Sequence, residues 1–306
     1  MDILDFLKEE GISQSLLDGV REFRRKYPSE QSEDGSSVMP YYLYYGKEIW
    51  EAALTALLCG KNLLLAGSKA TGKNVLSENL AAAFGRPCIN ISFHINMDAS
   101  FLIGTDTFAD GKVTFRPGPV YKCAAGGGFG ILDEINMARN EALAVLHSVL
   151  DFRHVIDIPG YERITVREDT RFIATMNHGY AGTRELNEAL ASRFVVIQMP
   201  EISKENLQKL IRKEFPSMKD TWVNQFTLLF MDIRRKCENG ELSSKMVDLR
   251  GLLDALELME HGLPVKTALD MGIVNKSFEE YDRNLVDDMI SARISEKLTP
   301  SDIFAG

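Results

Sequence analysis

The sequence predicts an α/β protein in which a parallel β-sheet carries helices on both faces and an all-helical segment follows. Between residues 47 and 199, short apolar runs typical of buried strands alternate with longer stretches of helical periodicity. A glycine-rich loop joins the first of these runs to a helix. Beyond Pro200 the apolar residues recur only at helical spacing, which predicts a separate helical segment.

The composition excludes several classes of protein. The chain has 306 residues, of which 45% are apolar and 26% charged, the balance of a globular protein. Its net charge of -9 argues against a generally basic surface for nucleic-acid phosphates. The four cysteines are widely spaced and complete no zinc motif, so we expect reduced thiols in the core. An acidic N-terminus and the lack of an apolar run of about 18 residues predict a cytoplasmic protein without membrane contact.

Composition also divides the chain into three predicted domains. Residues 1–40 are an N-terminal helical segment, with helical spacing over 3–27 and a polar linker after it. Residues 41–200 are the α/β core, and residues 201–306 are the helical segment. The basic residues of the first segment are typical of a solvated helix face: Arg21, Arg24, Arg25 and Lys26.

Apolar runs predict the strands of the sheet, at Asn62–Ala66, Ile89–Ile91, Gly130–Leu132, Phe172–Thr175 and Phe194–Met199. Helical periodicity predicts helices on either side of the first run, at Ile49–Leu58 and Val75–Phe84. Two further segments, Thr105–Pro117 and Val155–Thr170, have alternating apolar residues around the turns Asp110-Gly111 and Pro159-Gly160. They predict two β-hairpins inserted into the α/β pattern.

A candidate phosphate-binding loop connects the first strand to the helix that begins near Val75. Its glycines allow backbone N–H groups to surround a phosphate at the positive end of a helix, and Lys73 adds a cation for the β and γ phosphates. Asn74 stands where Ser or Thr is usual, and its amide oxygen could also ligate Mg²⁺, from one atom further out. The predicted nucleotide-binding residues here are Gly67, Ser68, Lys69, Ala70, Thr71, Gly72, Lys73, Asn74 and Val75.

Two strand ends carry the candidate catalytic residues. Asp133 and Glu134 follow one apolar run, and Asn177 ends another. At the carboxyl end of a parallel strand, Asp133 would ligate Mg²⁺ together with Asn74, and Glu134 would act as general base on a water molecule. Asn177 would hold that water or contact the γ phosphate if its strand lies beside the strand of Asp133. The alternatives are a helix N-cap pair for the two acids and a turn-forming role for Asn177.

The order of these motifs resembles the AAA+ ATPase family, which has a P-loop NTPase core and a helical lid. Within that family it resembles the MoxR-like branch, which includes the CbbQ, NorQ and dynein-related (AAA_5) proteins. The resemblance covers about residues 45 to 260 and identifies residues 67–74 with the Walker A loop. It identifies Ile131–Glu134 with the Walker B motif and Asn177 with sensor 1.

The same resemblance assigns roles to residues outside these motifs. It implies that Arg193 is an arginine finger acting on a neighbouring subunit, with Arg184 as the alternative, and that Arg250 is the sensor 2 arginine of the lid. Each arginine also fits an ordinary helix surface. The resemblance places the adenine near Tyr44, Tyr45 and Gly46, although the neighbouring tyrosines could equally form part of the core between linker and sheet. It directs both hairpins toward the pore of a ring, where a client would meet Phe108, Lys112, Phe115 and Tyr161; the alternative is that each hairpin packs on its own domain.

The resemblance implies an ATPase that uses ATP and Mg²⁺ and works as a homo-oligomer, a hexameric ring. Its output would be chaperone-like remodelling or activation of a client protein, such as one with a von Willebrand A domain. Two other functions fit the same residues. One is a McrB-like, nucleotide-dependent motor subunit associated with DNA, which the acidic net charge disfavours. The other is a non-hydrolysing switch, in which Asn74 weakens the metal site and ATP only sets assembly.

Overall fold

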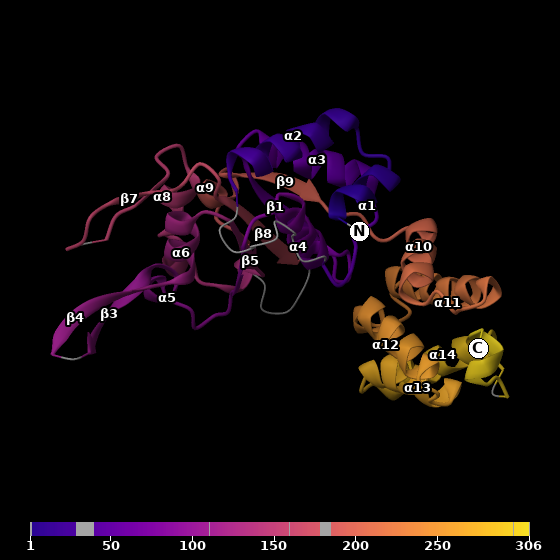
Figure 1. The fold of residues 1–306 in the computed structure, drawn as a ribbon. Coiled ribbons are helices and arrows are strands. Elements are labelled where there is room, and N and C mark those ends of the chain that lie inside the picture. The colour runs from indigo at the N-terminus through magenta and orange to yellow at the C-terminus, as the bar shows by residue number, and fades with distance from the viewer. Residues whose placement is uncertain are drawn as a thin grey trace. The chain divides into compact units, whose positions relative to one another are not determined.

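The computed structural model describes residues 2–28, 40–109, 111–158, 160–177, 185–295 and 297–305. The chain divides into two compact units. The first contains residues up to 68 and from 72 to 200, and the second contains residues 69–71 and those from 201 onward. The sheet belongs to the first unit (Figure 1).

The first unit is built on a five-stranded sheet in which all neighbouring strands are parallel. Its strands are β1 (Asn62–Gly67), β2 (Cys88–Ser92), β5 (Phe129–Asp133), β8 (Arg171–Asn177) and β9 (Phe194–Gln198), in the order β2-β5-β8-β1-β9. The predicted strands are confirmed, with ends that differ by at most two residues. The order places β8, which comes late in the sequence, between β1 and β5.

Successive residues of each strand face opposite sides of the sheet, and each side has its own core. Leu63 and Leu65 of β1 lie in one apolar cluster, and Leu64 lies in the other. The first cluster is closed by α1 (Ile3–Glu9), α2 (Gln14–Lys26), α3 (Lys47–Leu58) and α4 (Lys73–Ala83). The second is closed by α5 (Ala99–Ile103), α6 (Pro119–Gly126), η1 (Ile135–Met137), α7 (Asn140–Leu143), α8 (Leu146–Leu150) and α9 (Glu188–Ala191). The predicted α/β fold is therefore confirmed.

Both predicted hairpins are present. In the first, β3 (Gly104–Ala109) pairs with β4 (Lys112–Pro117) in antiparallel register. In the second, β6 (Val155–Ile156) and β7 (Ile164–Thr165) are shorter than the predicted alternation. The turn residues Asp110 and Pro159 lie outside the described residues.

A polar and aromatic contact joins the two hairpins. The hydroxyl of Tyr161 donates a hydrogen bond of 2.5 Å to Oδ1 of Asp106 in β3. The ring of Tyr161 also lies 5.0 Å from the ring of Phe115 in β4, measured between centroids. The two insertions therefore support each other.

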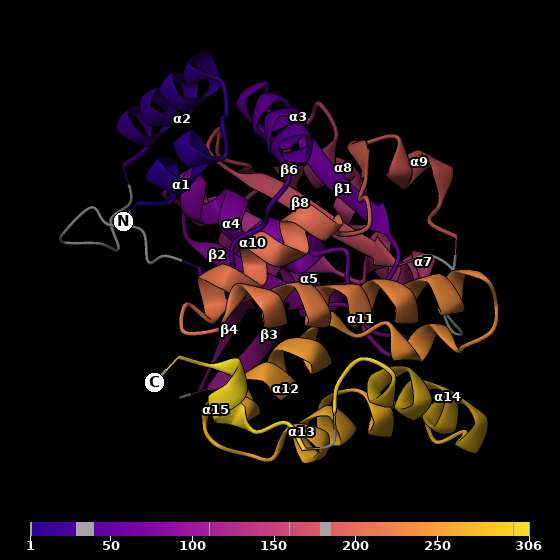
Figure 2. The same cartoon turned by 90° about the vertical axis from the view of Figure 1, so that its right-hand side faces the viewer.

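The second unit is helical, as predicted (Figure 2). Its helices are α10 (Lys204–Glu214), α11 (Asp220–Glu238), η2 (Ser244–Met246), α12 (Leu249–Glu260), α13 (Val265–Gly272), η3 (Val274–Lys276), α14 (Glu280–Ser291) and α15 (Pro300–Ile303). Helices α12 and α13 can approach closely because Gly251 has no side chain. A Cβ atom at that position would lie only 2.0 Å from the carbonyl oxygen of Gly272. Across the described parts of both units, no helix combines the length and apolar character needed to span a bilayer.

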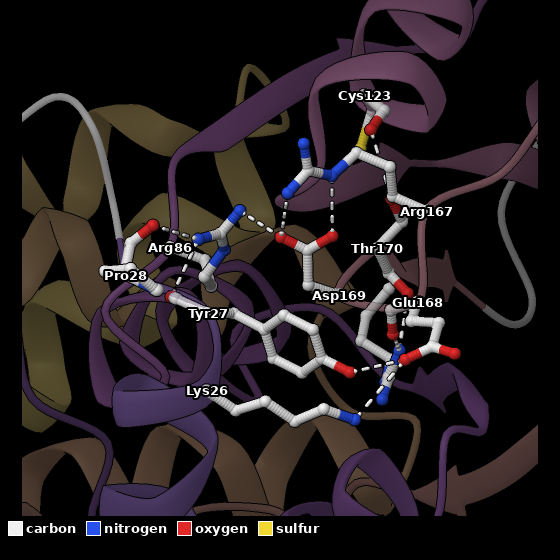
Figure 3. Close-up of polar contacts among 10 residues, drawn as sticks. Lys26, Tyr27, Pro28, Arg86, Cys123, Arg167, Glu168, Asp169 and Thr170 are labelled. Carbon is white, nitrogen blue, oxygen red and sulfur yellow. Dashed lines mark hydrogen bonds and ion pairs between the residues drawn. The ribbon is translucent and has the colours of Figure 1, made fainter.

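A buried polar network lies at the amino-terminal edge of the sheet (Figure 3). Arg86 forms an ion pair with Asp169, and their side chains are only 4% and 1% exposed. Arg86 also donates to the carbonyl oxygens of Tyr27, at 2.9 Å, and Pro28, at 3.2 Å. Arg167 donates from Nε to the other oxygen of Asp169, at 3.0 Å. The network therefore ties the end of α2 to the start of β8.

The prediction that Arg24 belongs to a solvated helix face is wrong. Its guanidinium donates to the carbonyl oxygens of Ala83, at 2.8 Å, and Ala82, at 3.0 Å, in the last turn of α4. It also forms an ion pair of 2.9 Å with Asp2. Carbonyls in the last turn of a helix lack intrahelical partners, so Arg24 acts as a cap supplied by another helix.

The four cysteines are free, as predicted, but they do not all lie in the core. Cys123 is buried, Cys237 is half-buried, and Cys59 and Cys88 are exposed. The expectation of burial in the core is therefore wrong for Cys59 and Cys88.

Candidate active site

The phosphate loop leaves β1 at Gly67 and enters α4 at Lys73, in the predicted strand-loop-helix context. Ala70 and Gly72 have φ angles of 62° and 80°, in the left-handed region. A Cβ atom on Gly72 would also lie 3.0 Å from the ring of Tyr44, so only glycine fits there without strain. The turn directs the chain into α4, whose N-terminal N–H groups and dipole favour an anion.

Lys73 is buried beside the loop, with 7% of its surface exposed. Its Nζ atom donates to the carbonyl oxygens of Gly67, at 3.1 Å, and Ser68, at 2.7 Å. Burial lowers the pKa of Lys73 to about 8, and the charges of Asp133 and Glu134 oppose this lowering. The two acids therefore lie within electrostatic range of the ammonium group.

The two acids are held by side chains of the neighbouring strand β8. The hydroxyl of Thr175 donates to Oδ1 of Asp133 at 2.6 Å and accepts the backbone N–H of Glu134 at 3.0 Å. Nδ2 of Asn177 donates to Oε1 of Glu134 at 2.9 Å. Glu134 itself has a φ of 54° and a ψ of 45°, a left-handed conformation that is uncommon for a residue with a side chain.

Strand order explains why these residues meet. Within the sheet, β8 pairs on one side with β1, where Gly67 lies opposite Asn177, and on the other side with β5, where Leu132 lies opposite Ala174. The phosphate loop, Asn177 and the two acids therefore share the carboxyl edge of three adjacent strands. That edge is where α/β proteins of this topology bind ligands.

The aromatic side chain against the phosphate loop is Tyr44. Its backbone N–H donates to Oδ1 of buried Asn79 at 2.9 Å, and Nδ2 of Asn79 donates to the carbonyl oxygen of Tyr42 at 2.8 Å. Burial raises the pKa of Tyr44 to about 12, so its hydroxyl stays protonated at ordinary pH. Tyr45 has its ring edge-on to Phe6 of α1, with centroids 5.4 Å apart. A role for Tyr45 in adenine binding stays a prediction.

Arg193 follows α9, and its side chain contacts residues in and directly after α8. Its Nε atom donates to the carbonyl oxygen of His147 at 3.1 Å, and Nη2 lies 3.6 Å from a carboxylate oxygen of Asp151. Hydrogen bonds from Arg153 lower the pKa of Asp151 to about 2, so this counter-ion is charged throughout the neutral range. The side chain of Arg193 remains 23% exposed. Its role as an arginine finger stays a prediction.

The other two predicted arginines are placed as follows. Arg184 lies outside the described residues. Arg250 is exposed in the first turn of α12, in the second unit, and its side chain makes no hydrogen bond or ion pair with another described residue. Its sensor role stays a prediction.

The donor set at the strand ends fits a triphosphate with Mg²⁺. Mg²⁺ prefers oxygen ligands and retains several waters or phosphate oxygens, so it needs few protein ligands. The Asp133 carboxylate and the amide oxygen of Asn74, which is half-buried in the first turn of α4, would be such ligands. Within the described residues, no group of three or more His, Cys, Asp or Glu side chains could hold a metal ion by itself. A metal here would depend on the nucleotide for further ligands.

Two residues of this arrangement were missed by sequence reasoning. Thr175 reads as an ordinary strand residue, although its place two residues before Asn177 puts both on one face of β8. Asn136, which is 3% exposed, donates from Nδ2 to the carbonyl oxygen of Asn177 at 3.0 Å. No sequence pattern marks Asn136, because its role depends on the fold of η1 beside β8.

Comparison with known proteins identifies relatives of the chain. A family model described as an AAA domain of the dynein-related subfamily matches residues 62–194. The uncharacterized protein YojN of Bacillus subtilis (strain 168) is 35% identical over 239 residues, 76% of this chain and 78% of that protein. The uncharacterized protein SH1500 of Staphylococcus haemolyticus (strain JCSC1435) is 31% identical over 255 residues, 81% of this chain and 97% of that protein. A solved structure from Cytophaga hutchinsonii, described as that of a candidate ATPase, is 17% identical with a TM-score of 0.45, and covers 92% of this chain and 98% of that one.

Proposed function

Because the chain belongs to the AAA+ ATPase family, in its dynein-related subfamily, we propose that it binds ATP and hydrolyses it to ADP and phosphate. The observation that carries the proposal is the order of the three strands at the carboxyl edge of the sheet. This order brings the cation of Lys73, the acids Asp133 and Glu134, and the amide of Asn177 together.

We assign a proposed role to each of these residues. The ammonium of Lys73 and the N–H groups at the start of α4 would neutralise the β and γ phosphates. Glu134 would accept the proton of the attacking water, and Asn177 would keep the Glu134 carboxylate in one orientation. Bound Mg²⁺, held by Asp133 and Asn74, would supply further positive charge at the phosphates.

We propose that the protein is MoxR-like and assembles as a hexameric ring in which Arg193 completes the site of the neighbouring subunit. Asp151 and the His147 carbonyl support this role, because they hold the guanidinium of Arg193 at a partly exposed position. Arg250 would act on the nucleotide of its own subunit. A mixture of Arg193→Ala and Glu134→Gln subunits should then recover activity that neither variant has alone, and a mixture as inactive as its components would contradict a shared site.

We propose that the hairpins contact a client protein, and the family resemblance suggests one with a von Willebrand A domain. Phe108 and Val113 lie opposite each other in the first hairpin and are 77% and 62% exposed, so this apolar pair is available for contact with a partner. Lys112 is next to this pair, while Phe115 and Tyr161 form the joint between the hairpins.

Phosphate release and calorimetry test the enzymatic proposal. The unmodified protein should release phosphate from ATP. Glu134→Gln should bind ATP without turnover, and Lys73→Ala should lose ATP binding. Glu78→Gln is the matched control, because Glu78 is an exposed acid on α4, and its turnover should equal that of the parent. Full turnover in Glu134→Gln would exclude Glu134 as the base.

Asn74 favours one second candidate, a switch that binds ATP without hydrolysing it. In that case ATP would change the size of the assembly in chromatography while no phosphate is released. Asn74→Ser separates the two functions, because restoring the usual hydroxyl ligand should create turnover in a switch and change it only modestly in an ATPase.

A further inference from the structure

We propose that Thr175 is a positioning residue for the reaction, whose single hydroxyl holds Asp133 and Glu134 together and sets the direction of the Glu134 carboxylate. This inference rests on the proposed ATPase function. Thr175 itself touches neither water nor phosphate in the proposed reaction, so it would act only through the two acids.

The hydroxyl of Thr175 is engaged on both sides. It donates its proton to Oδ1 of Asp133 at 2.6 Å, and the same oxygen accepts the N–H of Glu134 at 3.0 Å. Thr175 is 1% exposed, so water does not compete for either bond. A hydroxyl is the smallest side-chain group that can donate to a carboxylate and accept from an amide at once.

The geometry of the strands shows why such a bridge is needed. In a regular strand, Asp133 and Glu134 would point to opposite faces of the sheet. Their partners, Thr175 and Asn177, are two residues apart on β8 and so share one face. Both acids can reach these partners only because Glu134 leaves the extended conformation for the left-handed one, with a φ of 54°.

The left-handed conformation is strained for a residue with a Cβ atom, so something must stabilise it. The bond from the Glu134 N–H to Thr175 fixes the backbone at this position. With the backbone in this conformation, the Glu134 carboxylate lies within hydrogen-bond distance of Nδ2 of Asn177. Thr175 therefore determines whether Glu134 faces the proposed water position, while Lys73 and the phosphate loop remain untouched.

Two substitutions isolate the hydroxyl. Thr175→Val keeps the shape and removes both bonds, and Thr175→Ser keeps the hydroxyl while removing a methyl group. Thr170→Val is the matched control. Thr170 is also buried, just before β8, and donates to the carbonyl oxygen of Cys123 at 3.2 Å, at the opposite edge of the sheet. Each protein is measured for ATP affinity, for kcat and for hydrogen exchange of the Glu134 amide by NMR.

We expect Thr175→Val to bind ATP within about threefold of the parent and to lower kcat by about 10- to 100-fold, as is usual when support of a metal site is removed. Exchange of the Glu134 amide should be about tenfold faster or more, because a buried hydrogen bond is lost. Thr175→Ser should have the kcat and the Glu134 amide exchange rate of the parent, and Thr170→Val should change neither quantity.

If Thr175→Val leaves the hydrogen-exchange rate of the Glu134 amide unchanged, the proposal is overturned, whatever the value of kcat. So would equal losses in Thr175→Val and Thr170→Val, since these would indicate general destabilisation. If the unmodified protein releases no phosphate, the ATPase function fails, and the amide exchange still decides the role of Thr175.

Discussion

The buried ion pair between Arg86 and Asp169 allows a quantitative test of how the amino-terminal edge of the sheet is stabilised. Asp169→Asn removes one charge and keeps the shape of the side chain. The guanidinium of Arg86 then remains buried with only neutral oxygens as partners, including the carbonyl oxygens of Tyr27 and Pro28. Its Nε atom already has no partner among the described residues, so Arg86 depends on Asp169 for compensation.

The magnitude follows from the burial of the pair. Breaking a buried ion pair by removing one partner costs about 3–5 kcal/mol, because the remaining charge is left uncompensated. The surrounding residues have little room to move and so to compensate the charge of Arg86. The packing is so close that a Cβ atom on Gly127 would lie 2.5 Å from the Asp169 carboxylate. With a urea dependence of about 2–3 kcal/mol per M, the unfolding midpoint should fall by about 1–2.5 M.

Tryptophan fluorescence in urea measures this change in the first unit alone. The chain has two tryptophans, and Trp50 is fully buried in α3 of the first unit. Trp222 lies in α11 of the second unit, so a Trp222→Phe background leaves one probe. Comparing Asp169→Asn with its parent in this background gives the midpoint shift directly.

Arg167→Ala is the control, because Arg167 contacts the same carboxylate but its side chain is 53% exposed. An exposed partner contributes less than about 1 kcal/mol, so its loss should barely move the midpoint. Replacing the pair with Arg86→Met and Asp169→Leu should recover most of the loss, since no buried charge remains. A midpoint for Asp169→Asn within experimental error of the parent would refute the reasoning, and so would an equal drop in Arg167→Ala.

Three further predictions concern other parts of the first unit. Because burial lowers the pKa of Lys73 to about 8 and ATP requires its charged form, ATP affinity measured by calorimetry should fall as pH rises above 8, by up to about tenfold per pH unit; constant affinity to pH 9.5 would contradict this. Arg24→Gln should destabilise the first unit by about 1.5–3 kcal/mol in urea because the charged cap of α4 is lost, whereas Arg25→Gln, at a side chain 82% exposed, should have no measurable effect. Tyr161→Phe removes the hydroxyl that binds Asp106, so proteolysis of the hairpins should become faster while the urea midpoint is unchanged; equal cleavage rates would show that the hairpins do not support each other.

Local sequence signals predicted much of the fold and the outline of the site. Strands, the phosphate loop and the helical second unit were all visible, because each is encoded by short-range periodicity or by glycine at a tight turn. The position of β8 between β1 and β5 was not encoded locally. Without that order, the sequence could not show that Asn177 bonds to Glu134, since 43 residues separate them in the chain.

Contacts between distant segments were also beyond sequence reasoning. Arg24 lies in a basic stretch that looks solvated, yet it caps a helix 58 and 59 residues further along. Thr175 looks like a normal strand residue, because threonine is common in strands for reasons of shape alone. Among neighbouring tyrosines, the sequence could not choose which ring lies against Gly72, and the structure selects Tyr44.

Backbone strain at two residues supports the location of the candidate site independently of any motif. Among the described residues other than glycine, only Ala70, Glu134 and His154 have positive φ angles. Each such residue costs of order 1–3 kcal/mol, so it persists only where surrounding contacts hold it. His154 precedes β6, outside the candidate site. The other two belong to the candidate motifs: Ala70 is in the phosphate loop that follows β1, and Glu134 comes directly after Asp133. Glycine in place of Ala70 or Glu134 would remove the strain. It would also give the backbone more freedom, so that the direction of the chain would be less well fixed. Two of the three strained residues therefore lie beside the predicted chemistry, which is the arrangement expected if their strain orients groups for phosphate binding and water activation.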